Sequence, residues 1–200
     1  MSDLDPELVL PLLHGRLGRP YRFVERCAST QRLLGEDEPE GATVAADEQT
    51  EGRGRLGRSW EAPPGRAILC SVQLRPDVPM PIWPELSLVA GEAAAAALRG
   101  LGLDASLRYP NDVVVAGRKL VGVLPEARQG RVVLGIGVNV NQTADELPRE
   151  AAKPPTSVRV ELGREASRAE LFVSILAELE QGYDTWLAGH RRGRPELQFG

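Results

Sequence analysis

Short apolar stretches, each bounded by turn-forming residues, recur along the chain at the length and spacing of β-strands. In residues 67–74 the apolar positions alternate, which is typical of a strand with two different faces. Several stretches follow one another closely, and Ala116 and Gly117 form a tight hairpin signal between two of them. The predicted strands are residues 21–27, 42–46, 67–74, 106–109, 113–116, 120–124 and 131–140.

Two segments show the three- and four-residue spacing of amphipathic helices. In residues 84–101 the apolar pattern ends just before Gly102, a residue that commonly stops a helix. The last helix is predicted to begin at Ser167, because Ser167 and Glu170 have the spacing of a capping box. Shorter helical segments are predicted within the first 18 residues and at residues 28–35.

Strands outnumber these helices, and several strands are neighbours in sequence. This order favours an α+β fold, with a mixed or antiparallel central sheet packed with helices, over a doubly wound parallel sheet. A chain of 200 residues suits one domain, predicted to cover residues 1–190 with its core at about 20–190. Residues 191–200 lack a packing pattern and are predicted to form a polar tail.

Composition and charge narrow the function classes. The net charge of −4 excludes a generally basic nucleic-acid binder but allows a local basic site, and the stretch before residue 20 is too short for a winged-helix DNA reader. Cys27 and Cys70 form no Cys-x-x-Cys pair, and the spacing of a zinc site is absent. The sequence shows neither a signal-peptide pattern nor an apolar run near the ~20 residues of a membrane helix. We expect a cytoplasmic protein with reduced thiols, a disulfide being the less favoured alternative.

The most distinctive segment is the loop at residues 52–60, Gly-Arg-Gly-Arg-Leu-Gly-Arg-Ser-Trp. Its glycines spell G-x-G-x-x-G, but a dinucleotide-binding turn must open into a helix, and the prolines within residues 61–65 prevent one. A kinase glycine loop is excluded because no His-Arg-Asp or Asp-Phe-Gly signature follows. Arg53, Arg55 and Arg58 match carboxylate and phosphate oxygens, and the glycines let backbone amides approach an anion. An anion-binding loop is favoured over a solvated basic turn.

Two downstream motifs supply further polar candidates. Asn111 and Asp112 stand at a strand mouth, and Lys119 follows across the tight hairpin. A lysine at the start of an apolar strand is either an edge charge or a cation held in a site. The glycines of residues 135–141 indicate either close approach of a ligand or another backbone, or a β-bulge. Asn139 either bonds a nucleotide base edge or caps the following loop.

Together these segments resemble the central catalytic domain of the biotin–protein ligases, which has a class II synthetase-like fold. Residues 52–60 match the family's arginine-glycine loop, residues 108–112 its Lys-Trp-Pro-Asn-Asp motif, and residues 118–124 its Arg-Lys-x-x-Gly-Ile-Leu hairpin. The Gly-Ile-Gly-x-Asn-Val-Asn strand is intact at residues 135–141. The resemblance covers about residues 20–190, and four motifs in order are far more specific than any one of them.

The resemblance implies an ATP-dependent ligase with two half-reactions. Biotin and MgATP give biotinyl-5′-AMP, and a lysine of the biotin carboxyl carrier domain of acetyl-CoA carboxylase then takes the biotin. The expected substrates are ATP and biotin, and Mg²⁺ is expected to be held through the phosphates, with no dedicated protein cluster. No DNA or membrane partner is expected. Both monomers and homodimers occur in the family, so a homodimer stays open.

The same resemblance implies roles for individual residues. Lys119 is expected to touch the biotin carboxyl and α-phosphate oxygens. Arg53 and Arg55 would hold the phosphates and close the loop, and Asp112 would orient a metal or the incoming lysine. The catalytic residues implied are Lys119, Arg55, Arg53 and Asp112; those for biotin are Ser29, Thr30, Gln31, Gln49, Gly52, Arg53, Gly54, Arg55, Lys119 and Gly122; and those for ATP are Arg55, Trp60, Asn111, Lys119 and Asn139.

The sequence departs from the family's pattern in places. Arg-Tyr at residues 108–109 replaces Lys-Trp, Gln31 replaces an asparagine, and Pro125 is expected to interrupt its strand. The small β-barrel domain that usually follows is not expected, because only residues 191–200 remain after the last helix. A lipoate or octanoate ligase shares the fold and the lysine but lacks the arginine-glycine loop in this form. A non-catalytic module that binds biotin or its adenylate is the other alternative.

Overall fold

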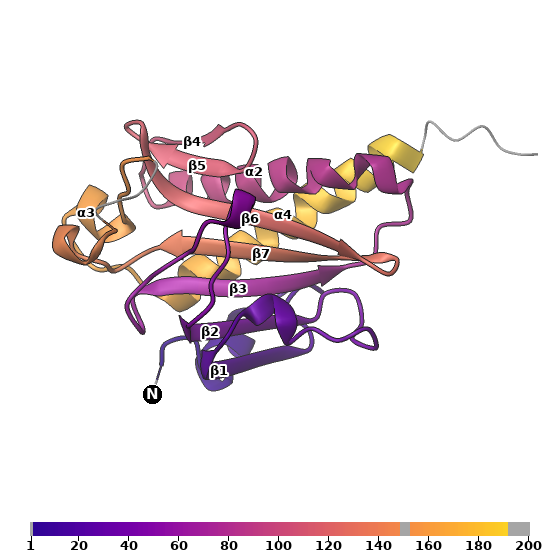
Figure 1. The fold of residues 1–200 in the computed structure, drawn as a ribbon, viewed down its shortest axis with the longest axis horizontal. Coiled ribbons are helices and arrows are strands. Elements are labelled where there is room, and N and C mark those ends of the chain that lie inside the picture. Colours follow the sequence, from indigo (N-terminus) through magenta and orange to yellow (C-terminus); the bar gives the residue numbers. More distant parts are fainter. Residues whose placement is uncertain (1, 149–152, 192–200) are drawn as a thin grey trace, which may run out of the picture.

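The computed structural model describes residues 2–148 and 153–191, which form a seven-stranded sheet packed against two long helices (Figure 1). The strands are β1 (Tyr21–Cys27), β2 (Thr43–Gln49), β3 (Ala67–Leu74), β4 (Ala105–Arg108), β5 (Asp112–Val115), β6 (Arg118–Arg128) and β7 (Arg131–Asn139), and the α-helices are α1 (Pro6–Val9), α2 (Leu86–Gly100), α3 (Val158–Leu162) and α4 (Arg168–Arg191). Of the predicted polar tail, residues 192–200 lie outside the described residues.

The sheet is mixed. Its order is β1-β2-β3-β7-β6-β5-β4. β1 and β2 run parallel, and every other neighbouring pair is antiparallel. The predicted α+β fold with a mixed central sheet is therefore confirmed.

The two long helices cover one face of this sheet. α4 passes behind β3, β7 and β6, and α2 lies beside it behind β5 and β6, whereas the segment between β2 and β3 lies on the opposite, open face (Figure 1). In β3, Ile68, Cys70 and Val72 join the main hydrophobic core, and the alternate residues Leu69 and Ser71 do not. All of β3 is nevertheless buried, so loops must cover its second face.

Cys27 and Cys70 are free thiols, and burial raises the pKa of Cys70 to about 12. None of the described helices is long and apolar enough to span a membrane.

β6 is longer than predicted. The predicted strand at 120–124 continues through Pro125, so the expectation that this proline interrupts it is wrong. Pro125 lies opposite Leu134 in the fourth pair from the two-residue turn at 129–130, and the pair next to such a turn is a hydrogen-bonded one. Alternate pairs of an antiparallel ladder exchange no N–H···O bonds, so the missing N–H of proline leaves no gap in the β6–β7 ladder.

Other elements differ from the prediction by more than a residue or two. The helix predicted at 28–35 is a single 3₁₀ turn, Thr30–Arg32, because the side chains of this turn bond to the sheet instead. β2 continues beyond residue 46 to Gln49. α3 was not predicted, since a helix of five residues is too short to show a helical period.

Both tight hairpins use residues with positive φ. The angle is 49° at Ala116 and 76° at Gly117, and 40° and 76° at Gln129 and Gly130. Two successive positive φ values form a type I′ turn, whose twist matches that of the flanking strands. The predicted hairpin at 116–117 is confirmed, and it sets β5 beside β6.

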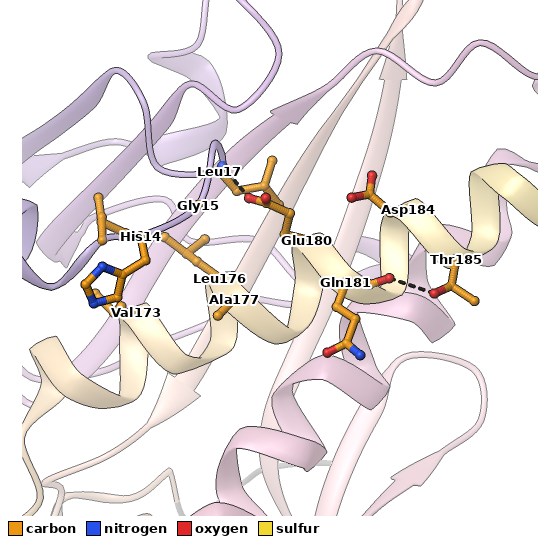
Figure 2. Close-up of a pocket in the computed structure, with 11 residues that line it drawn as sticks. His14, Gly15, Leu17, Val173, Leu176, Ala177, Glu180, Gln181, Asp184 and Thr185 are labelled. Carbon is orange, nitrogen blue, oxygen red and sulfur yellow. Dashed lines mark hydrogen bonds between the residues drawn. The ribbon is translucent and has the colours of Figure 1, made fainter.

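On the helix side, the N-terminal arm packs along α4 around a hollow of about 490 Å³ (Figure 2). The Glu180 carboxylate accepts the backbone N–H groups of Arg16 at 2.8 Å and Leu17 at 2.9 Å. A Cβ at Gly15 would lie 2.4 Å from Glu180 Oε2, so a larger residue there would displace this carboxylate from the two backbone groups. The lining comes from the arm and α4, so this hollow is separate from the open face of the sheet.

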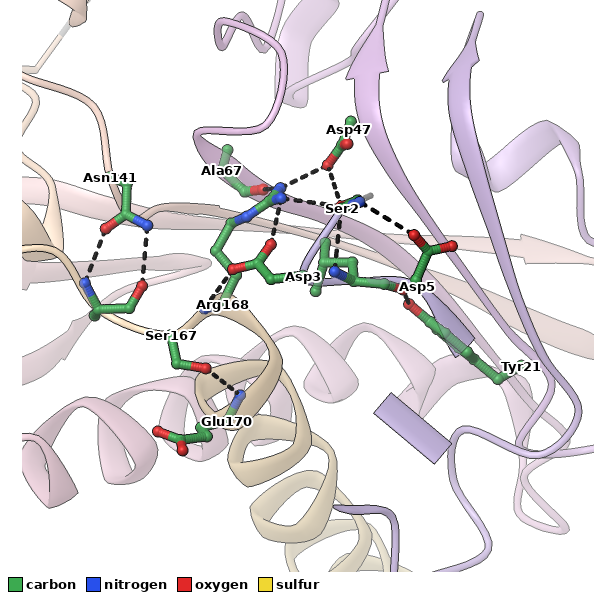
Figure 3. A network of polar contacts seen from close by, with 12 residues as sticks. Ser2, Asp3, Asp5, Tyr21, Asp47, Ala67, Asn141, Ser167, Arg168 and Glu170 are labelled. Atoms are coloured by element: carbon green, nitrogen blue, oxygen red, sulfur yellow. Dashed lines mark hydrogen bonds and ion pairs between the residues drawn. The ribbon is translucent and has the colours of Figure 1, made fainter. Parts of the chain in front are cut away.

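A buried arginine joins the start of α4 to the sheet and to the N-terminal residues (Figure 3). Arg168 is only 3% exposed, and its guanidinium pairs with Asp47 at 2.7 Å and also with Asp3. It donates to the Ala67 carbonyl at 3.0 Å and to Ser2 Oγ at 3.1 Å. These partners compensate the guanidinium for the loss of water, so the network fixes α4 against β2 and β3.

Replacing this arginine should destabilise the fold. Arg168→Met leaves two carboxylates without their cation, and we expect the free energy of unfolding in urea to fall by about 3 kcal/mol. Arg164→Met is the matched control, since Arg164 is exposed and, within residues 2–148 and 153–191, its guanidinium donates to the adjacent Glu165 carbonyl alone, at 3.5 Å. An equal loss in both variants would contradict the structural role assigned to Arg168.

Candidate functional site

The arginine-glycine loop folds back on itself over the open face. Trp60 N–H donates to the Gly52 carbonyl at 2.9 Å, and Gly54 N–H to the Arg58 carbonyl at 2.8 Å. At its tip, Leu56 has a φ of 59° and is 87% exposed. The loop therefore carries its own short backbone ladder, with no helix after it, as the sequence indicated.

Trp60 ends the loop and packs flat onto the sheet. Cβ atoms at Gly122 and Gly137 would lie 2.6 Å and 2.5 Å from its indole ring. Lys119 Nζ is 5.3 Å from the ring centroid, within cation–π range. Between its neighbours β3 and β6, β7 keeps a continuous register, so the alternative of a β-bulge at its glycines is wrong. The glycines are needed because a large ring lies directly on these strands.

The indole N–H of Trp60 is buried and has no hydrogen-bond partner among the described residues. A buried donor without an acceptor costs free energy, so this edge of the ring is a place where an acceptor atom of a ligand would be favourable.

A cluster of hydroxyl and amide groups lies at the start of the 3₁₀ turn. Gln49 Oε1 accepts the backbone N–H of Thr30 at 2.7 Å and its hydroxyl at 3.0 Å. The Thr30 hydroxyl is also 2.7 Å from Ser71 Oγ, and Ser29 beside it is buried. The structure thus brings Ser29, Thr30 and Gln49 together. It adds Ser71, whose only sequence signal was a polar residue inside an apolar strand.

Gln31 lies across β6 and β7. Its Nε2 donates to the carbonyls of Leu124 at 3.1 Å and Val133 at 3.2 Å. A Cβ at Gly135 would be 3.0 Å from its amide carbon, so the absence of a side chain at Gly135 makes room for the longer amide of Gln31.

Lys119 and Asp112 form an ion pair across the β5–β6 hairpin. Lys119 Nζ is 2.8 Å from Asp112 Oδ1, and Lys153 binds the other carboxylate oxygen. Burial alone raises the pKa of Asp112, but the hydrogen bonds and charges of both lysines outweigh it and hold the pKa below its ordinary value. The alternative of Lys119 as a simple edge charge is not supported. Lys153 was not predicted, because the proline- and charge-rich sequence of residues 143–155, which contains it, has no periodic pattern.

A strap of residues 154–156 fixes the backbone of Lys119. Lys119 N–H donates to the Pro154 carbonyl at 2.8 Å, and Thr156 N–H donates to the Lys119 carbonyl at 2.8 Å. Asn139 holds the same strap from β7: its Nδ2 donates to the Thr156 carbonyl at 3.0 Å, and its Oδ1 accepts from Gln142 at 2.9 Å. Asn139 is thus buried and engaged at both ends of its amide, and its role toward ATP stays a prediction.

Two loop arginines are tied to the strands below. Arg53 pairs with Glu126 at 3.1 Å, and Arg55 donates to Asn111 Oδ1 at 3.3 Å. Asn111 in turn donates to the Val123 carbonyl at 2.8 Å. Between the loop and β6 lies a hollow of about 370 Å³, lined by the loop with Leu124 and Glu126. The arginine-glycine loop thus partly covers a small hollow, whose other side is formed by apolar Leu124 and acidic Glu126 of β6.

The Asp112 pair should make stability depend on pH. Because the pKa of Asp112 is lowered on folding, its contribution is complete above its unfolded pKa of about 3.9 and is lost as pH falls through the lower folded value. The difference in unfolding free energy between the wild type and Asp112→Asn should therefore be constant above about pH 5 and shrink at more acidic pH. Urea unfolding from pH 2.5 to 7 measures it, and a difference that grows with acidity would contradict the ion pair.

Comparisons with known proteins agree with this geometry. The chain is 35% identical over 181 residues to the bifunctional ligase/repressor BirA of Bacillus spizizenii, covering 86% of this chain and 56% of that protein. It is 38% identical over 164 residues to the biotin--[acetyl-CoA-carboxylase] ligase of Mycobacterium tuberculosis, covering 79% and 58%. The biotin protein ligase from Aquifex aeolicus in complex with biotin and ATP superposes with a TM-score of 0.76 at 32% identity, covering 83% and 71%.

The chain thus spans somewhat more than half the length of these two curated relatives. The model of the biotin/lipoate A/B protein ligase family matches residues 23–142, from β1 through the asparagine motif at the end of β7. By this match, and by the placement of its loop, hairpin lysine and glycine-bearing strand on one face of a mixed sheet, the chain belongs to the biotin/lipoate A/B protein ligase family.

Proposed function

We propose that this chain activates biotin with ATP as biotinyl-5′-AMP and transfers it to a lysine of a biotin carboxyl carrier protein. One observation carries the proposal. Lys119, the hydroxyl–amide cluster of Thr30, Gln49 and Ser71, and the arginine-glycine loop with Trp60 lie on the side of the sheet away from the helix-packed core. Such a face can hold a neutral polar ring at one end and an anion at the other.

The hydroxyl–amide cluster suits the ureido ring of biotin. A ureido group has both N–H donors and a carbonyl acceptor, and hydroxyl and amide groups can serve either. Thr30 is held by Gln49 and Ser71, and Ser29 beside it is buried, so these groups are ordered before a ligand arrives. Leu124, which lines the hollow beneath the loop, offers an apolar surface to the aliphatic chain.

Lys119 suits the reacting end. In the first half-reaction a biotin carboxylate oxygen attacks the α-phosphorus, the bond from that phosphorus to its bridging oxygen breaks, and pyrophosphate leaves. Both partners are anionic, so a cation between them lowers their repulsion. Lys119 takes this position, Arg53 and Arg55 hold phosphate oxygens, and Trp60, Asn111 and Asn139 face ATP.

Mg²⁺ would accompany ATP and reduce the negative charge of its phosphates. Among residues 2–148 and 153–191, no group of three or more His, Cys, Asp or Glu side chains could hold a metal ion. The nearest carboxylate to Lys119, that of Asp112, is already bound by two ammonium groups. That Mg²⁺ is held through the phosphates of ATP stays part of the proposal.

In the second half-reaction the amine of the acceptor lysine attacks the acyl carbonyl carbon, the acyl–phosphate bond breaks, and AMP leaves. Asp112 lies beside Lys119 and would orient the incoming amine. The arginine-glycine loop would keep water from the adenylate until the acceptor docks.

A substrate assay tests this proposal. We expect the protein, given MgATP and each of biotin, lipoate and octanoate, to form an adenylate with biotin and then to increase the mass of an apo carrier domain. Lys119→Met should lower adenylate formation by about 10²-fold or more, because the bridging cation is lost.

No adenylate from biotin would overturn the proposal. Adenylate from lipoate or octanoate alone would indicate the other branch of the family. Adenylate without carrier modification would indicate a module that binds the activated acid.

The lid role of the loop has its own test. Arg55→Gly removes the contact with Asn111, so activated biotin should escape and label lysines of an unrelated protein several-fold faster. Arg58→Gly is the matched control, because it loosens the same loop and leaves that contact intact. Biotin on lysines of the unrelated protein is measured by mass spectrometry. Equal labelling by both variants would argue against the Arg55–Asn111 contact as the one that keeps the loop closed.

A further inference from the structure

The chain contains 24 lysines and arginines, of which only Lys119 and Lys153 are lysines. Both lysines bind one carboxylate. Lys119 Nζ is 2.8 Å from Asp112 Oδ1, and Lys153 Nζ binds Asp112 Oδ2. Two ammonium groups from segments more than thirty residues apart therefore converge on a single side chain.

The three groups differ in exposure. The Asp112 side chain is 6% exposed, whereas those of Lys119 and Lys153 are 27% and 29% exposed. Within the described residues, neither lysine forms an ion pair with any other carboxylate. One carboxylate can neutralise only one of them, so the cluster carries one uncompensated positive charge at an open face.

Lys153 is held in place by its neighbours in sequence. It directly precedes the strap of residues 154–156, and that strap exchanges two backbone hydrogen bonds with Lys119. The two ammonium groups are therefore attached to backbones that are bonded to each other. This connection keeps Lys153 within reach of Asp112.

The second lysine matters when Lys119 binds a substrate anion. If Lys119 were the sole partner of Asp112, its move to a substrate anion would leave a nearly buried carboxylate without a cation, which is costly. We propose that Lys153 is a positioning residue that keeps Asp112 neutralised and so releases Lys119 to the anion. The inference rests on the proposed function of Lys119, and it adds a residue that acts through Asp112 without contact to substrate.

A double-mutant cycle tests the inference. Biotin affinity is measured by calorimetry for the wild type, Lys153→Met, Asp112→Asn and the double variant. We expect Lys153→Met to weaken biotin binding about tenfold in the wild-type background and to have no further effect when Asp112→Asn is present. Lys153→Arg, which keeps the charge, should recover most of the affinity.

An uncharged ligand separates this role from a structural one. Biotinol, the alcohol that lacks the carboxylate, offers Lys119 no anion, so Lys153→Met should not change its affinity. Thermal unfolding of each variant checks that the fold is kept. An equal loss for biotin and biotinol, an equal loss with and without Asp112→Asn, or no loss at all would each overturn the inference. If the wild type binds neither biotin nor ATP, the proposed function itself fails.

Discussion

Both faces of the central strands have to be covered, and helices cover only one of them. α2 and α4 occupy one side, and the residues of β3 are nevertheless buried on both. The cover on the second face comes from the arginine-glycine loop, the 3₁₀ turn after β1 and the strap after β7. In a helix the backbone N–H and C=O groups bond to one another, whereas loops leave some of these groups and their polar side chains free to bind a ligand. Because loops cover the second face, that face becomes a polar site.

Close approach of these covering segments explains the glycines of β6 and β7. Trp60 lies on Gly122 and Gly137, and Gln31 lies on Gly135. The strands therefore provide a flat floor on which aromatic and amide groups can be placed without displacing the backbone. A side chain at any of the three positions would have to push away a segment that closes the site.

Charge in this face is organised by individual partners. Arg53 is tied to Glu126, Arg55 to Asn111, and both lysines to Asp112. The two lysines share one carboxylate, and Arg55 has a neutral amide as its acceptor. Positive charge is therefore in excess on this face, although each of these side chains is held by a partner. Such partly compensated cations can exchange a protein partner for a ligand anion at a lower cost than cations that must be desolvated anew.

The sequence by itself determined what is local: the strands with their period of two, the two long helices, the hairpin at 116–117 and the motifs that carry the family resemblance. The prediction that Pro125 interrupts its strand was wrong, because the effect of a proline depends on its register in the β-ladder. Only the tertiary structure decided which distant residues meet, such as Ser71 with Thr30 and Lys153 with Asp112. The physical reason is that periodicity and turn chemistry act over a few residues. The order of the strands and the paths of the loops across them are set by packing between distant parts of the chain.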